Sequence, residues 1–244
     1  MNIKNIFFLL VSIFFLAAGN GPYGEDMHSN HNLNYAQIFP GEYLKANDFI
    51  QRNIENDIFF LNNQISPHFA WSIVFPELMR YSSFSDKIEL SSLYTLYVNF
   101  GEKYADFSVG PFQMKPSFVE QIEKDYLKNK NKIALTEEFK FDTNSSKAAR
   151  INRIQRLENS RWQVCYLVLF IKLLDEKYSQ IEWENPSEKL RFFASAYNCG
   201  YRHPYKNILS FEKTAKFHIG IIKTPVAQFY SYCSIAQYHF ENEK

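Results

Sequence analysis

The sequence predicts a mainly α-helical fold, in one domain of about 200 residues behind a short leader. Apolar residues recur at helical spacing in most segments, and no stretch alternates between apolar and polar residues for long enough to form a sheet. Ser-Pro and Asn-Pro pairs, which are typical N-cap and first-turn residues, stand before two of these segments. The chain of 244 residues can bury a substantial core.

The first 19 residues have the pattern of a secretory signal peptide. Lys4 precedes an apolar run from Ile6 to Ala18, which Ser12 alone interrupts, and Gly19 follows. The run is too short to span a bilayer, so we expect an exported protein, periplasmic or extracellular, with no stable membrane span after cleavage. Residues 20–41 begin polar and are expected to form a flexible arm. The helical domain is then predicted to occupy residues 42–244.

Composition excludes some classes of function. The 27 basic and 26 acidic residues nearly balance, so the charge predicts no nucleic-acid partner. Aromatic residues make up 18% of the chain, and some are expected to line a groove of the kind that suits sugars. Cys165, Cys199 and Cys233 allow one disulfide and one free thiol, or three buried thiols. The sequence has no CxxC pair, so cysteine spacing does not indicate a metal site. No cofactor is expected, and the sequence does not indicate the oligomeric state.

Helical signals organise the first half of the domain. Residues 42–62 have apolar positions at helical spacing, namely Leu44, Phe49, Ile50, Ile54, Ile58 and Leu61. Ser66-Pro67 opens the next helix, in which Pro76 is expected to cause a kink. A further helix is predicted over residues 86–100 and ends before Gly101. Residues 104–116 are expected to form a loop, because Gly110-Pro111 breaks any regular element.

The second half begins with a helix from Pro116 to Lys128, followed by a polar connector to about Ser146. Residues 147–178 form one long helix or two abutting ones, of which residues 164–174 are apolar nearly all round and should be central. Arg150, Arg153 and Arg156 share one side and are expected to be solvated rather than to bind an anion. Two more helices are predicted, from Asn185-Pro186 to Gly200 and from Thr224-Pro225 to about Phe240.

Glu77 is the candidate catalytic residue, because it is the one carboxylate in the apolar run from Ile73 to Tyr81. It has two interpretations. In the first it is a solvated helix residue that pairs with Arg80 at i+3. In the second, neighbours such as Ile73 and Leu78 exclude water, raise the pKa of the carboxylate and keep it protonated, as a general acid requires.

Three short motifs stand in chain order: Glu77 in its helix, Gly-Pro-Phe-Gln-Met-Lys-Pro from Gly110 to Pro116, and Ala-Tyr-Asn-Cys-Gly from Ala196 to Gly200. Together they resemble the lytic transglycosylases of the soluble-lytic-transglycosylase type, relatives of goose-type lysozyme. That family carries a catalytic Glu, then Gly-Leu-Met-Gln with a Pro three residues on, then Ala-Tyr-Asn-Ala-Gly. The resemblance covers over half of the chain, from about residue 66 to 201, and implies a lysozyme-like helical domain.

The resemblance also implies an activity and a site. Glu77 would act as the single acid/base on the bond between MurNAc and GlcNAc in peptidoglycan glycan strands. It would protonate the glycosidic oxygen and then take a proton from the C6 hydroxyl of the same MurNAc, leaving a 1,6-anhydro end. The residues implied to bind substrate are Gly110, Phe112, Gln113, Met114, Tyr197 and Asn198.

The sequence departs from the family at several positions. Leu78 follows Glu77 where the family has Ser, and Cys199 replaces Ala. Between Glu77 and Gly110 lie 32 residues, so a helix is inserted where the family has a groove wall. Two alternatives therefore stay open. In the first, Asp106 is the second carboxylate of a hydrolytic muramidase, against a structural role in which it caps a turn or pairs with a base such as Lys103. In the second, the protein binds glycan in the envelope without cleaving it.

Overall fold

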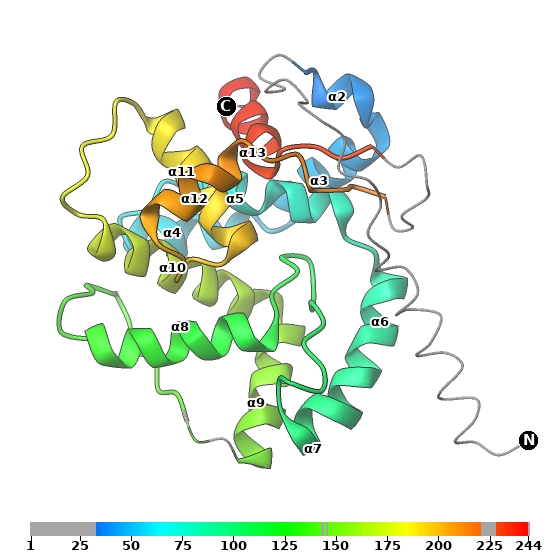
Figure 1. The fold of residues 1–244 in the computed structure, drawn as a ribbon, viewed down its shortest axis with the longest axis vertical. Helices are drawn as coiled ribbons and strands as arrows, with labels where there is room; N and C mark the ends of the chain where they lie inside the picture. Colours follow the sequence, from blue (N-terminus) through cyan, green and yellow to red (C-terminus); the bar gives the residue numbers. More distant parts are fainter. Residues whose placement is uncertain (1–32, 143, 145, 221–227, 244) are drawn as a thin grey trace, which may run out of the picture.

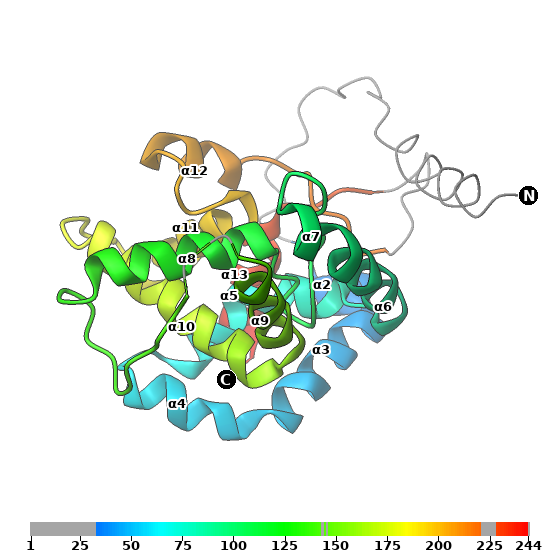
Figure 2. The same cartoon turned by 90° about the horizontal axis from the view of Figure 1, so that it is seen from below.

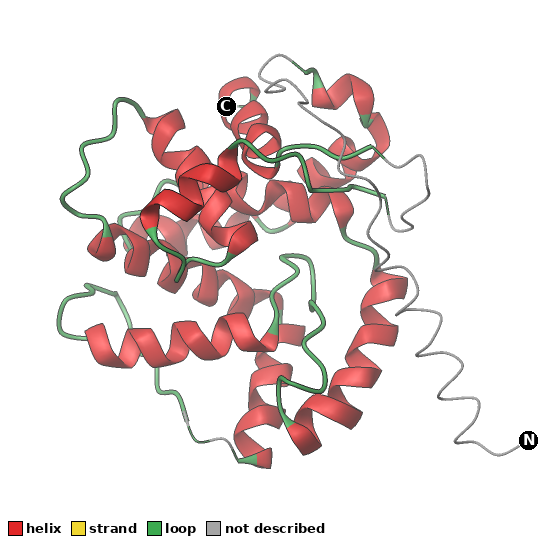
Figure 3. Ribbon diagram, viewed as in Figure 1, coloured by secondary structure: helices red, strands yellow, loops and turns green. Residues whose placement is uncertain are grey.

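The computed structural model describes residues 33–142, 144, 146–220 and 228–243. Within these ranges the protein is helical, and its β structure is limited to two isolated bridges, Val109 with Met114 and Phe217 with Tyr230 (Figure 3). The predicted mainly α fold is therefore confirmed for this part of the chain. The predicted signal peptide and the first residues of the expected arm lie outside the described residues.

The helices follow one another along the whole described chain (Figure 1). They are α2 (Tyr35–Ile38), α3 (Pro40–Arg52), the 3-10 turn η2 (Ile54–Asn56), α4 (Asp57–Asn62), α5 (Pro67–Arg80), α6 (Ser83–Ser92), the π turn η3 (Leu93–Tyr97), α7 (Val98–Phe100), α8 (Pro116–Asn129), α9 (Lys147–Glu158), α10 (Ser160–Lys177), α11 (Pro186–Cys199), α12 (Tyr205–Glu212) and α13 (Tyr232–Asn242).

The N-cap residues predicted from the sequence cap their helices in the structure. Ser66 caps α5, with its Oγ accepting from the backbone N–H of Phe69 at 3.3 Å, and Asn185 caps α11 in the same way. The segment from residue 147 to 178 is two helices, because Asn159 leaves the helical conformation and its side chain caps α10. Gly200, with φ +102°, ends α11 in a conformation that favours glycine.

Helix α5 lies in the middle of the fold. It packs against α3, α4, α10, α11 and α13, and every residue from Ala70 to Met79 is buried. Pro76 lies inside this helix, which continues for one more turn to Arg80. Helix α10 is the second central element, and its residues 163–171 are buried all round. In both views α6 and α7 lie at one edge of the molecule, opposite the connection between α10 and α11 (Figures 1 and 2).

The packed helices begin earlier than predicted, and the last helix begins later. Residue 42 lies inside α3, and Tyr35, in the expected arm, is only 1% exposed, so the packed domain begins earlier. The last helix begins at Tyr232, with Ser231 as its N-cap, whereas Thr224-Pro225 lies outside the described residues. Tyr230 is not helical because it pairs with Phe217 in a β-bridge. Helix α12 was not predicted.

The pattern of apolar residues in the first helices predicted the helix but not its buried face. Leu44, Ile54, Ile58 and Leu61 are all more than half exposed. The buried positions are instead Tyr43, Ala46, Phe59 and Phe60. Periodicity identifies an apolar stripe on a helix but does not show whether a neighbouring element covers that stripe. In this region large aromatic side chains occupy the buried face instead.

The three cysteines are free thiols, so the option of a disulfide is not realised. Cys165 and Cys233 are buried, and Cys199 is half-buried. Burial raises the pKa of the Cys199 thiol to about 11. The thiol form therefore dominates at neutral pH, which makes this cysteine a poor nucleophile.

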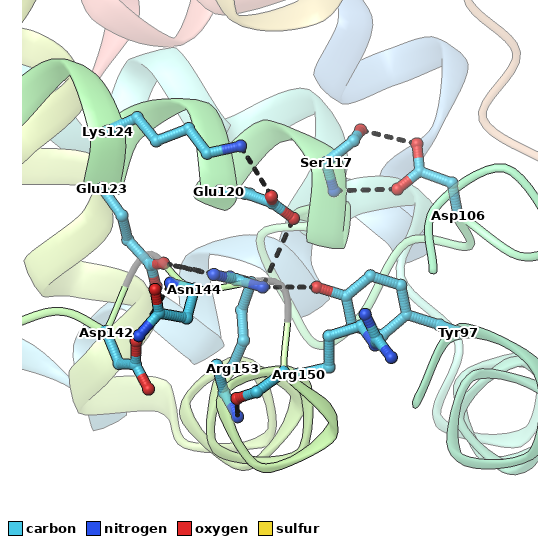
Figure 4. A network of polar contacts seen from close by, with 12 residues as sticks. Tyr97, Asp106, Ser117, Glu120, Glu123, Lys124, Asp142, Asn144, Arg150 and Arg153 are labelled. Atoms are coloured by element: carbon cyan, nitrogen blue, oxygen red, sulfur yellow. Dashed lines mark hydrogen bonds and ion pairs between the residues drawn. The ribbon is translucent and has the colours of Figure 1, made fainter. Parts of the chain in front are cut away.

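The arginine stripe of α9 is not solvated as predicted. Arg153 is 1% exposed and lies between Glu123, Glu120 and the Tyr97 hydroxyl (Figure 4). Its Nη2 lies 2.7 Å from Oε2 of Glu123, and its Nη1 donates to Tyr97 at 2.6 Å. Arg156 also contacts Glu123, at 3.1 Å. This buried network joins α8, α9 and the π turn before α7. It therefore fixes the helices at both ends of the loop 101–115, which connects α7 to α8.

Replacing Arg153 with Met should lower the free energy of unfolding by about 3–5 kcal/mol, because it leaves the buried Glu123 with one cation fewer. Urea unfolding followed by circular dichroism measures the change. The exposed pair of Lys130 with Glu138 provides the control, and Lys130→Met should leave the free energy of unfolding nearly unchanged. Equal effects of the two substitutions would contradict a stabilising role for the network.

Candidate active site

A cleft of about 710 Å³ opens beside the last turn of α5, and we call it the main cleft. Four parts of the chain form it: α5, the loop before α8 with the start of α8, the end of α11, and the turn before α12. Its lining residues are Glu77, Arg80, Asp106, Ser108, Gln113, Met114, Lys115, Ser117, Phe118, Gln121, Tyr197, Asn198, Cys199, Gly200, Arg202, His203 and Pro204. Glu77, Gln113 and Tyr197, which are far apart in the sequence, therefore meet in one place.

Glu77 combines features of both interpretations made from the sequence. It is 5% exposed, and Nη2 of Arg80 lies 2.7 Å from its Oε2. Oε2 has this ion-pair contact and no further partner among the described residues. Burial raises the pKa of the Glu77 carboxyl, and the charges of Arg80 and Lys115 oppose that rise in part. Glu77 is thus a dry acid with an incompletely satisfied oxygen at the main cleft.

Two buried tyrosines stand beside Glu77. The Tyr197 hydroxyl donates to the carbonyl oxygen of Phe112 at 2.6 Å, and the Tyr232 hydroxyl donates to that of Ile73 at 3.0 Å. The pKa of each hydroxyl is raised, first by burial and then by the nearby Glu77 charge. Both tyrosines stay neutral, and their hydroxyls are directed to backbone carbonyls. Tyr232 was missed because no sequence signal links the start of the last helix to Glu77.

The loop before α8 is a tight turn held by distant side chains. Val109 and Met114 pair through two backbone hydrogen bonds of 2.9 and 3.2 Å, and Gly110 in the turn has φ +70°. The buried Gln163 of α10 donates to the carbonyl of Val109 at 3.0 Å and accepts from the N–H of Phe112 at 2.9 Å. Tyr197 of α11 binds the same turn, so α10 and α11 both position it.

The residues implied by the resemblance divide into two groups. Glu77, Gln113, Met114, Tyr197 and Asn198 line the main cleft. Gly110 and Phe112 are not among its lining residues, and both are buried. The ring of Phe112 packs against Trp71 at 5.9 Å and Phe49 at 6.4 Å between centroids. Phe112 is therefore a core residue, not a substrate contact, because its turn directs the ring inward.

Gln113 has φ +50°, and its Nε2 donates to the carbonyl of Gly110 at 2.9 Å. The side chain thus stabilises the turn while it lines the main cleft. Asp106 also lines the cleft, but both of its oxygens are engaged by Ser117, at 2.9 Å from the backbone N–H and 2.6 Å from Oγ (Figure 4). It caps the first turn of α8, which is the capping role that the sequence left open.

Helix α6 adds carboxylates that sequence reasoning did not single out. A smaller cavity of about 280 Å³, which we call the side cavity, adjoins the main cleft. The two share Arg80, Asp106, Ser108, Gln113 and Lys115 in their linings. Asp86 and Glu89 of α6 line the side cavity. Oδ1 of Asp86 accepts from the N–H of Gly110 at 2.6 Å, which ties α6 to the loop.

Glu89 is a half-buried carboxyl of the side cavity whose pKa lies well above its usual range. Burial and the nearby Asp86 raise its pKa to about 7, while Arg80 and Lys115 oppose the rise. Its ionisation therefore changes near neutral pH. The i, i+3 spacing of Asp86 and Glu89 was the available signal, since it places both on one face of the inserted helix.

The described residues give no group of three or more His, Cys, Asp or Glu side chains placed to hold a metal ion. Among the helices described, none is long and apolar enough to cross a membrane. No family model, curated protein or solved structure matches the chain.

Gly110→Ala should destabilise the loop, because an ideal Cβ there would lie 1.8 Å from Nε2 of Gln163 and the backbone has positive φ. We expect a loss of about 2–4 kcal/mol in the free energy of unfolding, measured by urea denaturation. Gly41→Ala is the matched control, since nothing lies within 4 Å of the added carbon and the residue is in α3. It should be neutral or stabilising by up to about 1 kcal/mol. A harmless Gly110→Ala would contradict this close approach of loop and helix.

The pKa of Glu89 predicts a pH-dependent stability. The folded protein binds a proton at Glu89 more tightly than the unfolded chain does. Stability therefore falls as the pH rises from 4.5, the ordinary pKa of a glutamate, to about 7, the pKa of Glu89 in the folded protein. Glu89→Gln removes this loss. The variant should match the wild type near pH 4 and gain about 1–2 kcal/mol near pH 8, less than the full shift because the side chain is partly solvated. Thermal unfolding across pH measures this, and a gain that does not depend on pH would contradict the assignment.

Proposed function

We propose that the protein is a peptidoglycan lytic transglycosylase that cleaves the β-1,4 bond between MurNAc and GlcNAc. The observation that carries the proposal is the meeting of Glu77, Gln113 and the Tyr197-Asn198 pair in one cleft. These residues come from three separate motifs that resemble that family, in the same order. The predicted signal peptide supports export to the periplasm or beyond, where glycan strands are found.

Glu77 is suited to the first step. A general acid must be protonated near neutral pH, and burial raises the pKa of this carboxyl. Glu77 would give its proton to the glycosidic oxygen as the bond to C1 of MurNAc breaks. The ionised Glu77 would then accept the proton of the C6 hydroxyl as its oxygen bonds to C1. The products are a 1,6-anhydro-MurNAc end and a free 4-hydroxyl on GlcNAc.

The surroundings of Glu77 suit this chemistry. The nucleophile belongs to the sugar that is cleaved, so its effective concentration is high and a second carboxylate is not needed. Arg80 lies against Oε2 and would stabilise the carboxylate formed after the first proton transfer. The amides of Gln113, Gln121 and Asn198 line the cleft with the apolar Met114 and Phe118, a mixture suited to the polar edges and apolar faces of sugars.

Glu77→Gln should abolish release of soluble products from purified cell walls, with a loss of at least about 10²-fold, because the amide cannot transfer the proton. Mass spectrometry identifies anhydro ends, and a thermal unfolding curve verifies that the variant is folded. Glu42→Gln, which removes an exposed carboxylate on α3, is the control and should keep full activity. Undiminished release by Glu77→Gln would remove Glu77 from the mechanism.

The contact between Arg80 and Glu77 supports a second candidate function, a non-catalytic protein that binds glycan in the envelope. A cation 2.7 Å from Oε2 favours the ionised form of the carboxyl, in which it cannot act as an acid. Wall pull-down without soluble product from the wild type would favour this candidate, and turnover by the wild type would exclude it.

A further inference from the structure

The main cleft and the side cavity share Arg80 and Lys115 in their linings, and a second carboxylate lines the side cavity beside the same two cations. Glu77 lines the main cleft and Glu89 the side cavity. Arg80 and Lys115 line both and lower the pKa of both carboxyls, so each acid lies within electrostatic range of each cation. The two acids come from α5 and from the inserted helix α6 (Figure 1).

The other carboxylates of the side cavity already have structural tasks. Asp86 holds the N–H of Gly110 at 2.6 Å, and Asp106 holds Ser117 through both oxygens. The structure shows no hydrogen bond or ion pair from a described side chain to the carboxylate of Glu89. Glu89 is half-buried at the wall of a cavity that shares Arg80 and Lys115 with the cleft of Glu77. It is thus the carboxylate of the side cavity that is available for chemistry.

Arg80 contacts Glu77 and also lines the side cavity with Glu89. Its guanidinium carbon lies 4.9 Å from the centre of the Phe217 ring, and its Nη2 lies against Glu77. A cation held there reduces the repulsion between two carboxylates that share a cleft. Arg80 therefore favours different protonation states for Glu77 and Glu89 in adjoining cavities, a division of roles that acid/base pairs in glycosidases require.

We propose that Glu89 is a second catalytic residue, a base that activates water, so that the protein also hydrolyses the glycosidic bond it cleaves. This inference rests on the proposed function of Glu77. In the hydrolytic step Glu77 gives its proton to the glycosidic oxygen as the C1–O bond breaks. Glu89 accepts a proton from a water molecule whose oxygen bonds to C1. One water is consumed, and a reducing end and a free 4-hydroxyl form. Proton exchange with solvent then protonates Glu77 again and deprotonates Glu89.

The side cavity predicts how the two products depend on pH. Glu89 faces Asp86 on its own helix, Arg80 from α5, and Lys115, Asp106 and His218 from the loops around the cavity. With a pKa of about 7, Glu89 is a base only toward the alkaline side of neutrality. Below that range the C6 hydroxyl is the competing nucleophile and anhydro ends should dominate. Above it, reducing ends should increase.

The test uses the full chain and purified peptidoglycan in water enriched in ¹⁸O, with products weighed at pH 5.5 and pH 8. We expect wild type to place one ¹⁸O at the new reducing end, with a labelled fraction about tenfold higher at pH 8. Glu89→Gln should lose the labelled product at pH 8 by at least about tenfold and keep release of anhydro ends. Glu102→Gln, an exposed carboxylate outside both linings, should behave as wild type.

The outcomes separate the two proposals. Anhydro ends alone at both pH values would overturn the role of Glu89 and leave that of Glu77 intact. An unchanged labelled fraction in Glu89→Gln would do the same. If wild type released nothing, the proposed function would fail and this inference with it. Should Glu89→Gln not fold, the pH dependence of ¹⁸O incorporation by the wild type still decides, since a labelled fraction that is constant with pH excludes Glu89 as the base.

Discussion

The burial of Glu77 in α5 is the constraint on which the rest of the site depends. Helices on several sides enclose α5, so a carboxylate in its last turns loses water unless a cleft reaches it. The main cleft does reach Glu77, and Arg80 supplies the nearest opposite charge. An acid in this position destabilises the fold when ionised. Its presence inside an apolar helix is therefore better explained by chemistry at the cleft than by stability.

The loop before α8 shows how contacts between helices position a residue of the candidate site. Its tight turn is bound by Asp86 from α6, Gln163 from α10 and Tyr197 from α11. None of these helices could fix the turn alone, because each contributes one or two hydrogen bonds at a different point. Together they hold Gln113 at positive φ beside the main cleft. The position of Gln113 is thus a product of tertiary structure, although the residue itself was recognisable in the sequence.

Local chemistry made much of the helical framework predictable. Ser66 and Asn185 cap helices because their side chains satisfy free N–H groups, and that effect depends only on neighbouring residues. The environment of Arg153 was not predictable, because its partners Glu123 and Tyr97 come from other helices. Charge at regular spacing normally indicates solvent, and only the three-dimensional arrangement shows that these charges neutralise one another in the interior.

The same limit explains which part of the site the sequence revealed. Motifs identified Glu77, Gln113 and Tyr197, whereas Glu89 lies in a segment that resembles no motif. Its role follows from the bond that Asp86 makes to Gly110. Residues three apart share a helix face, so anchoring Asp86 to the loop turns Glu89 toward the side cavity. When Asp86 of the inserted helix binds the loop, Glu89 is therefore placed in the side cavity as well. One turn of α6 thus provides both the support of the loop and the proposed base.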